Sequence, residues 1–337
     1  MKRIVCFGEM LMRLAAPGKE PLLRSALLEA TFCGAEANVA VSLAHFGLDA
    51  AAVTVLPENS LGDACLGELR RHGVDTAAVR RAPGRMGLYF LSPGSGLRPA
   101  QIVYDRINSS FAGADPAIHD WRTVLTGCDW LHVTGITPAL SKSAEKALLA
   151  ATAMAADLGV PVSFDCNFRP ALWRGREQDA PRVLRGLTDQ AQLLLGGVRD
   201  AALLFGADFG AEEPAEGFRR AAEAVLAACP KLRYMAATHR LVHTAEHNEL
   251  TGYLADRAGV SISGPITLNP IVDRIGSGDA FAAGLLFGLC EGLGRQRTVE
   301  FALAAAALKH SLPGDFNVVS AQEVFDLQQS SGRDVRR

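Results

Sequence analysis

The chain has no C-x-x-C pair, no excess of basic residues and no long apolar run. Its seven cysteines are scattered, which argues against a disulfide framework or a zinc site and favours a reducing compartment. The net charge of −2 gives no basic stripe for nucleic acid. The apolar run at residues 4–7 is too short for a signal h-region, and no stretch is long enough to span a bilayer. We therefore expect a cytoplasmic protein that binds neither nucleic acid nor membrane.

Repeats, low-complexity segments and charge blocks are also missing, and the chain has the composition of a globular protein, with 49% hydrophobic and 21% charged residues. Short apolar runs alternate with longer Ala/Leu-rich segments. The runs predict strands at 4–7, 51–56, 130–134, 161–165, 192–195 and 234–238, and the segments predict helices at 35–46, 61–72, 141–158, 217–228, 279–291 and 299–311. This alternation predicts an α/β fold with a mostly parallel central sheet covered on both faces.

Two segments, at about 10–32 and 86–108, break this alternation and predict a small inserted β-layer, here called the lid. The second contains two expected strands, 87–92 and 101–106. The lid has little core of its own although it carries Leu88, Phe90, Ile102 and Tyr104, so we expect a second copy to cover it in a dimer or larger homo-oligomer. We expect one α/β domain over 1–325, into which the lid is inserted, followed by a polar tail over 326–337.

Residues 271–284, IVDRIGSGDAFAAG, form the most informative stretch of the chain. A glycine turn runs into a helix, so the N–H groups of Gly276, Ser277 and Gly278 lack intrahelical partners and predict an anion site. Asp279 is either a base beside that site or an ordinary acid favoured by the helix dipole, and we expect it to be ionised. A base beside an anion hole is the equipment for phosphoryl transfer to a hydroxyl.

Three further stretches are candidates for ligand contact, and each has an ordinary alternative. Residues 165–170 place an acid, an amide and a guanidinium at an expected strand end, where ligands of parallel sheets bind, or form a surface salt-bridge set. Residues 33–40 form a small-residue helix entry where Gly34 and Asn38 could meet a ligand, or only a helix start. His239, His243 and His247 recur every four residues, but their loop-like context favours a solvated loop over a metal site.

Together these stretches resemble the ribokinase-like (PfkB) carbohydrate kinases, and more narrowly their 2-keto-3-deoxygluconate kinase branch. The likeness runs through nearly the whole chain. It is carried by residues 8–9 (Gly-Glu), 33–38 (Cys-Gly-Ala-Glu-Ala-Asn), 87–90 (Gly-Leu-Tyr-Phe), 104–106 (Tyr-Asp-Arg), 134–140 (Thr-Gly-Ile-Thr-Pro-Ala-Leu), 165–173 (Asp-Cys-Asn-Phe-Arg-Pro-Ala-Leu-Trp), 273–281 (Asp-Arg-Ile-Gly-Ser-Gly-Asp-Ala-Phe) and 312–317 (Leu-Pro-Gly-Asp-Phe-Asn). It implies a ribokinase-like α/β/α sandwich and an ATP-dependent kinase that phosphorylates the 6-hydroxyl of 2-keto-3-deoxygluconate.

The resemblance also implies roles for single residues. Asp279 would be the base, and Gly276, Ser277 and Gly278 would hold the γ-phosphoryl group. The sugar-acid pocket would be lined by Gly34, Asn38, Tyr89, Tyr104, Arg106, Ile136, Asn167 and Arg169, and the nucleotide would meet Asp200, Thr238 and Arg240. Mg²⁺ would be bound by the ATP phosphates, with few direct protein ligands, and a monovalent cation such as K⁺ could lie near Asp273.

The chain departs from the family pattern at three places. It has Cys33-Gly34 in place of Gly-Gly, residues 197–200 (Gly-Val-Arg-Asp) in place of Asn-x-x-Glu, and residues 236–240 (Ala-Ala-Thr-His-Arg) in place of the Lys-x-Gly-x-x-Gly loop. Two alternatives therefore stay open: a kinase of the same fold for a neutral sugar such as fructose or ribose, and a catalytically silent sugar- or nucleotide-sensing module.

Overall fold

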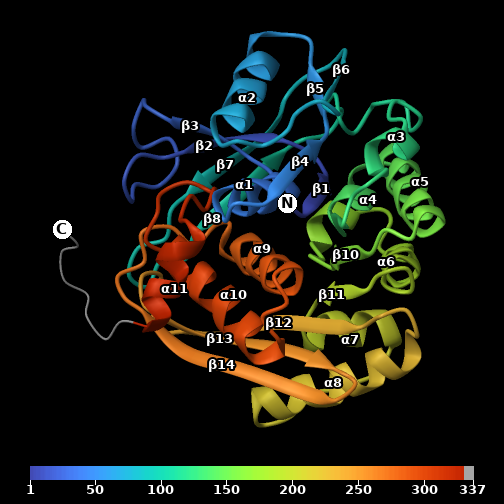
Figure 1. Cartoon of the computed structure of the whole chain (residues 1–337). Coiled ribbons are helices and arrows are strands. Elements are labelled where there is room, and N and C mark those ends of the chain that lie inside the picture. The colour runs from blue at the N-terminus through green and yellow to red at the C-terminus, as the bar shows by residue number, and fades with distance from the viewer. Residues whose placement is uncertain (330–337) are drawn as a thin grey trace.

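A sheet of eight strands, in the order β14-β13-β12-β11-β10-β9-β1-β4, runs through the computed structural model, which describes residues 1–329 (Figure 1). Its strands are β1 (Arg3–Phe7), β4 (Asp49–Val53), β9 (Trp130–Thr134), β10 (Val162–Asp165), β11 (Leu193–Leu195), β12 (Tyr234–Val242), β13 (Asn248–Asp256) and β14 (Gly259–Leu268). The six strands from β4 to β12 are parallel, and β13 and β14 are antiparallel. The expected mostly parallel sheet is confirmed.

Helices cover both faces of this sheet and enclose two apolar cores. On one face lie α1 (Ala35–His45), α2 (Ser60–Arg71), α9 (Ser277–Cys290), α10 (Arg295–Lys309) and α11 (Ala321–Gln329). On the other lie α3 (Trp121–Leu125), α4 (Thr137–Leu140), α5 (Lys142–Leu158), α6 (Ala180–Thr188), α7 (Val198–Phe205) and α8 (Pro214–Ala228), with a 3-10 turn at Pro170–Trp173. None of the helices within residues 1–329 is both long and apolar enough to cross a membrane.

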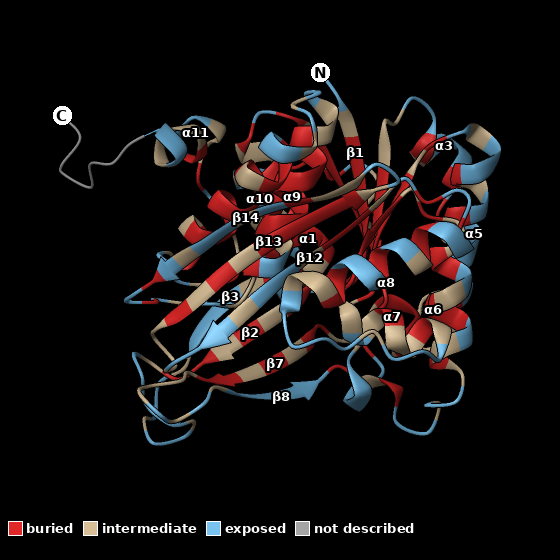
Figure 2. Cartoon of the chain, turned by 90° about the horizontal axis from the view of Figure 1, so that it is seen from below, coloured by how far each residue is buried: buried red, intermediate tan, exposed pale blue. Residues whose placement is uncertain are grey.

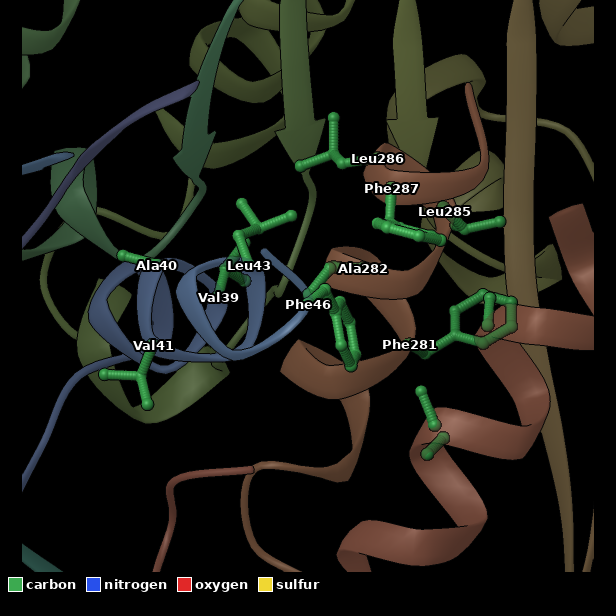
Figure 3. Packing of buried hydrophobic residues seen from close by; sticks show 14 of the residues in the cluster. Val39, Ala40, Val41, Leu43, Phe46, Phe281, Ala282, Leu285, Leu286 and Phe287 are labelled. Carbon is green, nitrogen blue, oxygen red and sulfur yellow. The ribbon is translucent and has the colours of Figure 1, made fainter. Parts of the chain in front are cut away.

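The pair α1 and α9 fixes the position of the glycine turn. Figure 3 shows Leu43 of α1, and Phe46 directly after this helix, beside Ala282 of α9. The Phe46 ring packs edge-on against Phe287 at a centroid distance of 5.6 Å. Small residues let the neighbouring helix come close: a Cβ on Gly284 would lie 2.5 Å from the Cα of Ala302 in α10. This rigid packing holds the N-termini of α1 and α9 next to each other.

The lid is a second sheet, with the order β3-β2-β7-β8. It consists of β2 (Leu11–Ala15), β3 (Glu29–Cys33), β7 (Gly87–Ser92) and β8 (Gln101–Asp105), and a short pair, β5 (Val55–Pro57) and β6 (Arg80–Ala82), lies beside the body. Figure 2 shows β8 exposed along its whole length at the edge of the molecule.

The lid presents two different faces. Tyr89 pairs with Tyr104 and Leu91 with Ile102, so these side chains share one face of the lid. On this face Tyr89 and Leu91 are buried, whereas Tyr104 and Ile102 on the edge strand are exposed. Phe90 pairs with Val103 on the opposite face. Of the four apolar residues named from the sequence, Leu88 and Phe90 therefore lie on one face of the lid and Ile102 and Tyr104 on the other, because alternate residues of a strand point to opposite sides.

Two other boundaries differ from expectation. The predicted strand 234–238 continues to Val242, since β12 pairs with β13 through residues 238–242. Thr238 and Arg240 consequently lie inside a strand and not at its end. The predicted polar tail, 326–337, begins within α11, and residues 330–337 lie outside the described part of the chain.

Candidate active site

The glycine turn lies where the sequence predicted it, at the start of α9. Gly276 precedes the helix with a φ of 82°, and a Cβ there would lie 2.0 Å from the backbone oxygen of Asp315, so only glycine fits. Among residues 1–329, neither Gly276 nor Gly278 donates its N–H to a hydrogen bond. The N–H of Ser277 donates a long bond, 3.3 Å, to the carbonyl of Arg274. The helix start thus offers two free donors, and a third that is weakly engaged, to an anion.

Asp279 is the third residue of α9 and borders this turn. Burial raises the pKa of its carboxyl group to about 7, and the charges of Asp315 and Glu36 act in the same direction. Burial thus opposes the ionised state that the sequence predicts for Asp279, while the hydrogen bond from Asn38 and the charge of Arg169 favour it. A carboxylate with a pKa near the working pH suits a general base.

Asn38 holds this carboxyl group in place. Its Nδ2 donates a 2.6 Å hydrogen bond to Oδ2 of Asp279, and this bond opposes the rise in the pKa of Asp279. Its Oδ1 accepts from the N–H of Gly34 at 3.3 Å. A Cβ on Gly34 would lie 2.5 Å from the carbonyl oxygen of Glu9, so the chain itself leaves no room for a side chain here. Asn38 therefore orients the carboxyl group of Asp279, and the backbone of Gly34 in turn orients Asn38.

The end of β10 brings a second carboxyl group and a free guanidinium to the same edge. Burial, together with the charges of Asp279 and Asp200, raises the pKa of Asp165 to about 8. Asn167, with a φ of 38°, donates its N–H to Oδ1 of Asp165 at 3.0 Å. Arg169 is exposed, has no ion-pair partner within residues 1–329, and lowers the pKa of both Asp165 and Asp279. Its guanidinium is available to an anionic ligand.

The lid residues Tyr89 and Arg106 are engaged inside the protein. The hydroxyl of Tyr89 donates to the carboxylate of Asp315 at 2.8 and 2.9 Å. Arg106 is buried, and its Nε donates to Oε2 of Glu9 at 2.7 Å. Its guanidinium also lies over the ring of Tyr104, which is 38% exposed. The charge of Arg106 is already balanced by Glu9. Arg169, whose guanidinium has no ion-pair partner within residues 1–329, is therefore the better candidate to bind the carboxylate of a ligand.

A buried network under the turn could not be inferred from the sequence. Arg13 of β2 lies between two carboxylates, with 2.7 Å from Nη2 to Asp273 and 2.7 Å from Nη1 to Asp315. Burial raises the pKa of Asp315, while Arg13 and the hydroxyl of Tyr89 lower it. The one signal in the sequence was a charged residue at an inward position of an otherwise apolar lid strand.

Arg240 approaches the turn from β12 with no carboxylate partner in the described chain. Its Nη2 donates to Oγ of Ser277 at 3.1 Å, and its Nη1 lies 2.8 Å from Nε2 of His310. Nδ1 of His310 lies 2.6 Å from the carbonyl of Ala306, so we assign the proton to Nδ1 and the acceptor role to Nε2. Burial lowers the pKa of His310 to about 3 and that of Arg240 to about 10. A half-buried guanidinium whose hydrogen-bond partners are neutral groups is suited to a phosphate.

The remaining predicted residues have local roles. Asp200 accepts a 2.8 Å bond from the N–H of Gly197 and so caps α7. Ile136, after the end of β9, donates its N–H to Oγ1 of Thr134 at 3.2 Å, and Thr238 is exposed on β12. Residues 1–329 contain no group of three or more His, Cys, Asp or Glu side chains arranged to hold a metal.

Comparisons with known proteins agree with this geometry. The sequence model of the family described as pfkB family carbohydrate kinase matches residues 1–320. A 2-dehydro-3-deoxygalactonokinase of Haloferax volcanii is 30% identical to this chain, and the alignment covers 95% of both chains. A 2-dehydro-3-deoxygluconokinase of Bacillus subtilis is 28% identical, and the alignment covers 99% of this chain and 97% of that one. The crystal structure of a 2-dehydro-3-deoxygluconokinase from Thermotoga maritima superposes with a TM-score of 0.94, at 36% identity, over 98% of this chain and all of that one.

Proposed function

The chain belongs to the pfkB family of carbohydrate kinases, and we propose that it transfers the γ-phosphoryl group of ATP to the 6-hydroxyl of 2-keto-3-deoxygluconate. The observation that carries this proposal is the carboxyl group of Asp279, which has a pKa of about 7, is held by Asn38 at 2.6 Å, and borders the free N–H groups of Gly276 and Gly278. The names of relatives supply the substrate class.

In the proposed reaction Asp279 accepts the proton of the 6-hydroxyl as this oxygen forms its bond to the γ-phosphorus. The bond between that phosphorus and the oxygen bridging to the β-phosphate breaks, and ADP leaves. The N–H groups of Gly276, Ser277 and Gly278 stabilise the charge on the transferring group, and Arg240 adds a positive charge from the side of Ser277. Arg169, which is exposed and unpaired within residues 1–329, binds the sugar carboxylate.

The donor groups at the turn fit the phosphates of a nucleotide, since Arg240 has no carboxylate partner in the described chain and the helix start offers free N–H groups. When bound, Mg²⁺ would neutralise charge on the ATP phosphates. We infer that residues 1–325 form one kinase domain with the lid inserted, and that the enzyme is cytoplasmic, in line with its seven free cysteines.

A coupled assay of ATP consumption with Mg²⁺ tests this proposal on 2-keto-3-deoxygluconate, its C4 epimer 2-keto-3-deoxygalactonate, fructose and ribose. The epimer is included because a relative at 30% identity carries that name. We expect turnover of the 2-keto-3-deoxy sugar acids, with a product that is phosphorylated at the 6-position. In the Asp279→Asn variant, which keeps the shape of the base, kcat should fall by about 10²- to 10⁴-fold. If only a neutral sugar is phosphorylated, the protein is a kinase but the sugar-acid assignment is wrong. If no sugar is phosphorylated, the result favours a catalytically silent sugar- or nucleotide-sensing module.

A further inference from the structure

Lys309, the last residue of α10, is completely buried. Its ammonium group donates to two backbone carbonyls, that of Leu312 at 3.1 Å and that of Asp273 at 3.3 Å. Burial lowers the pKa of Lys309, while the nearby charges of Asp273 and Asp315 raise it. Lysine is rarely buried so completely, and a buried ammonium is kept only where oxygen atoms replace its water.

The two carbonyls belong to the two loops that shape the glycine turn. Asp273 opens the segment that leads to Gly276, and Leu312 opens the loop that leads to Asp315, whose backbone oxygen leaves no room for a Cβ on Gly276. The adjacent residue His310 adds to this junction, because its carbonyl accepts from the N–H of Val272 at 2.8 Å. The ammonium group therefore links, through hydrogen bonds, the two loops on either side of the predicted phosphate site.

The two carboxylates closest to this position in the network already have cationic partners. Arg13 pairs with both Asp273 and Asp315, and the charges of Asp273, Asp315 and Asp279 also act on the ammonium group of Lys309. Potassium ions and ammonium groups both carry a single positive charge and both bind backbone carbonyl oxygens. The monovalent cation expected near Asp273 therefore does not fit, because a side chain of the protein already binds the carbonyl of Asp273 and no carboxylate in this network lacks a cationic partner.

We propose that Lys309 is a built-in monovalent cation, a positioning residue that holds the glycine turn and makes this kinase independent of K⁺. The proposal rests on the proposed function, since it assigns the turn to the phosphoryl group. Its action is indirect: Lys309 contacts backbone oxygens of the two loops beside the turn and not the turn's N–H groups, so its loss should lower kcat more than it changes the KM for the sugar.

The first experiment measures turnover of the wild type in KCl, NaCl and choline chloride at equal ionic strength. We expect equal kcat in all three salts. Activation of the wild type by K⁺ over choline would overturn the proposal.

The second experiment compares Lys309→Ala, which empties the position of the ammonium, with Lys309→Met, which removes the charge but keeps the aliphatic stem. In choline we expect kcat of both variants to fall by about 10- to 100-fold, the range for losing hydrogen bonds from a charged donor. K⁺ or NH₄⁺ should restore part of the activity of Lys309→Ala but not of Lys309→Met, because only the alanine variant leaves space for an ion. Normal kcat for Lys309→Met in choline, or no restoration of Lys309→Ala by either ion, would contradict the proposal.

Thermal unfolding gives a readout that needs no substrate. K⁺ should raise the Tm of Lys309→Ala relative to choline and leave that of the wild type and Lys309→Met unchanged. If no sugar is phosphorylated at all, the proposed function fails while this measurement still decides whether a cation replaces Lys309. If Lys309→Ala does not fold in either salt, kcat of Lys309→Met in choline decides, and a normal value rejects the proposal.

Discussion

The amide nitrogen of Asn38 donates a 2.6 Å hydrogen bond to the carboxylate of Asp279, although the two residues lie 241 positions apart. The bond joins the first turn of α1 to the first turn of α9, whose packing is shown in Figure 3. It favours the ionised form of Asp279, and so opposes the rise in pKa that burial causes. Asn38 therefore lowers the pH at which the proposed base becomes active.

Replacing Asn38 by alanine should move the pH dependence of kcat/KM. Asp279 must be deprotonated to accept a proton, so kcat/KM of the wild type should fall as the pH drops below about 7. Asn38→Ala removes a bond that lowers the pKa of Asp279, so this limb should move to higher pH, by about one to two units if the bond has the usual strength of one to a charged group. The measurement is kcat/KM from pH 5 to 9.

Asn59 offers a matched control, since it caps α2 far from the site by accepting from the N–H groups of Leu61 and Gly62. Asn59→Ala should cost about 1 kcal/mol of stability without moving the pH limb. An acid limb that stays in place in Asn38→Ala would show that another group controls it.

The two glycines of the turn should respond differently to a side chain. Gly276→Ala should destabilise the fold by at least about 1 kcal/mol, because alanine at a φ of 82° is strained and its Cβ would meet the backbone of Asp315. Gly278 has open space around its Cβ position, so Gly278→Val should fold normally. It should still lose about 100-fold or more of kcat, because its side chain would occupy the proposed phosphoryl site. Tm and kcat of both variants test this contrast, and an active Gly278→Val would place the phosphoryl group elsewhere.

Arg106→Leu should damage folding, because it leaves the carboxylate of Glu9 buried without a cation. The expected loss is about 3–5 kcal/mol in the free energy of unfolding, measured with denaturant. Arg85→Leu is the control, since Arg85 forms an exposed ion pair with Asp105 on the same lid and should cost less than about 1 kcal/mol. If Arg106→Leu is as stable as Arg85→Leu and only raises the KM for the sugar acid, Arg106 binds substrate directly.

The outer face of the lid should mediate pairing with a second copy. Ala30, Leu14, Phe90 and Val103 lie in register across its four strands, and Val103 is 56% exposed. Light scattering at micromolar concentration should give at least a dimer, and Val103→Asp should shift it towards the monomer. Leu149→Asp, at an exposed apolar position of α5, should not. A fully active wild-type monomer would contradict this prediction.

The secondary structure was predictable where the pattern of apolar and turn residues within a short segment determines it. The strands at 130–134 and 87–92 have the predicted bounds, since each is an apolar run ended by turn residues. The antiparallel strands β13 and β14 were not predicted, because their pairing is non-local and Gly252 interrupts the pattern of β13. That glycine has a structural reason: a Cβ there would lie 3.1 Å from the ring of Phe281 in α9.

The position of the glycine turn and Asp279 at a helix start was predictable, but the contacts of the candidate site residues were not. The glycine turn and Asp279 follow from a few consecutive residues, and both lie as expected. The partners of Arg106, Tyr89 and Asn38 come from distant parts of the chain, as does the pair Arg13 and Asp315, 302 positions apart. Buried polar groups must find partners, but the sequence does not show which partner each finds.

Arg169 gives the most direct test of the account as a sugar-acid kinase. The measurement is the ratio of kcat/KM for 2-keto-3-deoxygluconate to that for fructose, in the wild type and in Arg169→Leu. The wild type should prefer the sugar acid, and the variant should lose at least about tenfold of this preference with an unchanged KM for ATP, since a lost charge contact typically costs about 2–5 kcal/mol. A wild type that phosphorylates fructose better, or a preference that survives in Arg169→Leu, would contradict the account.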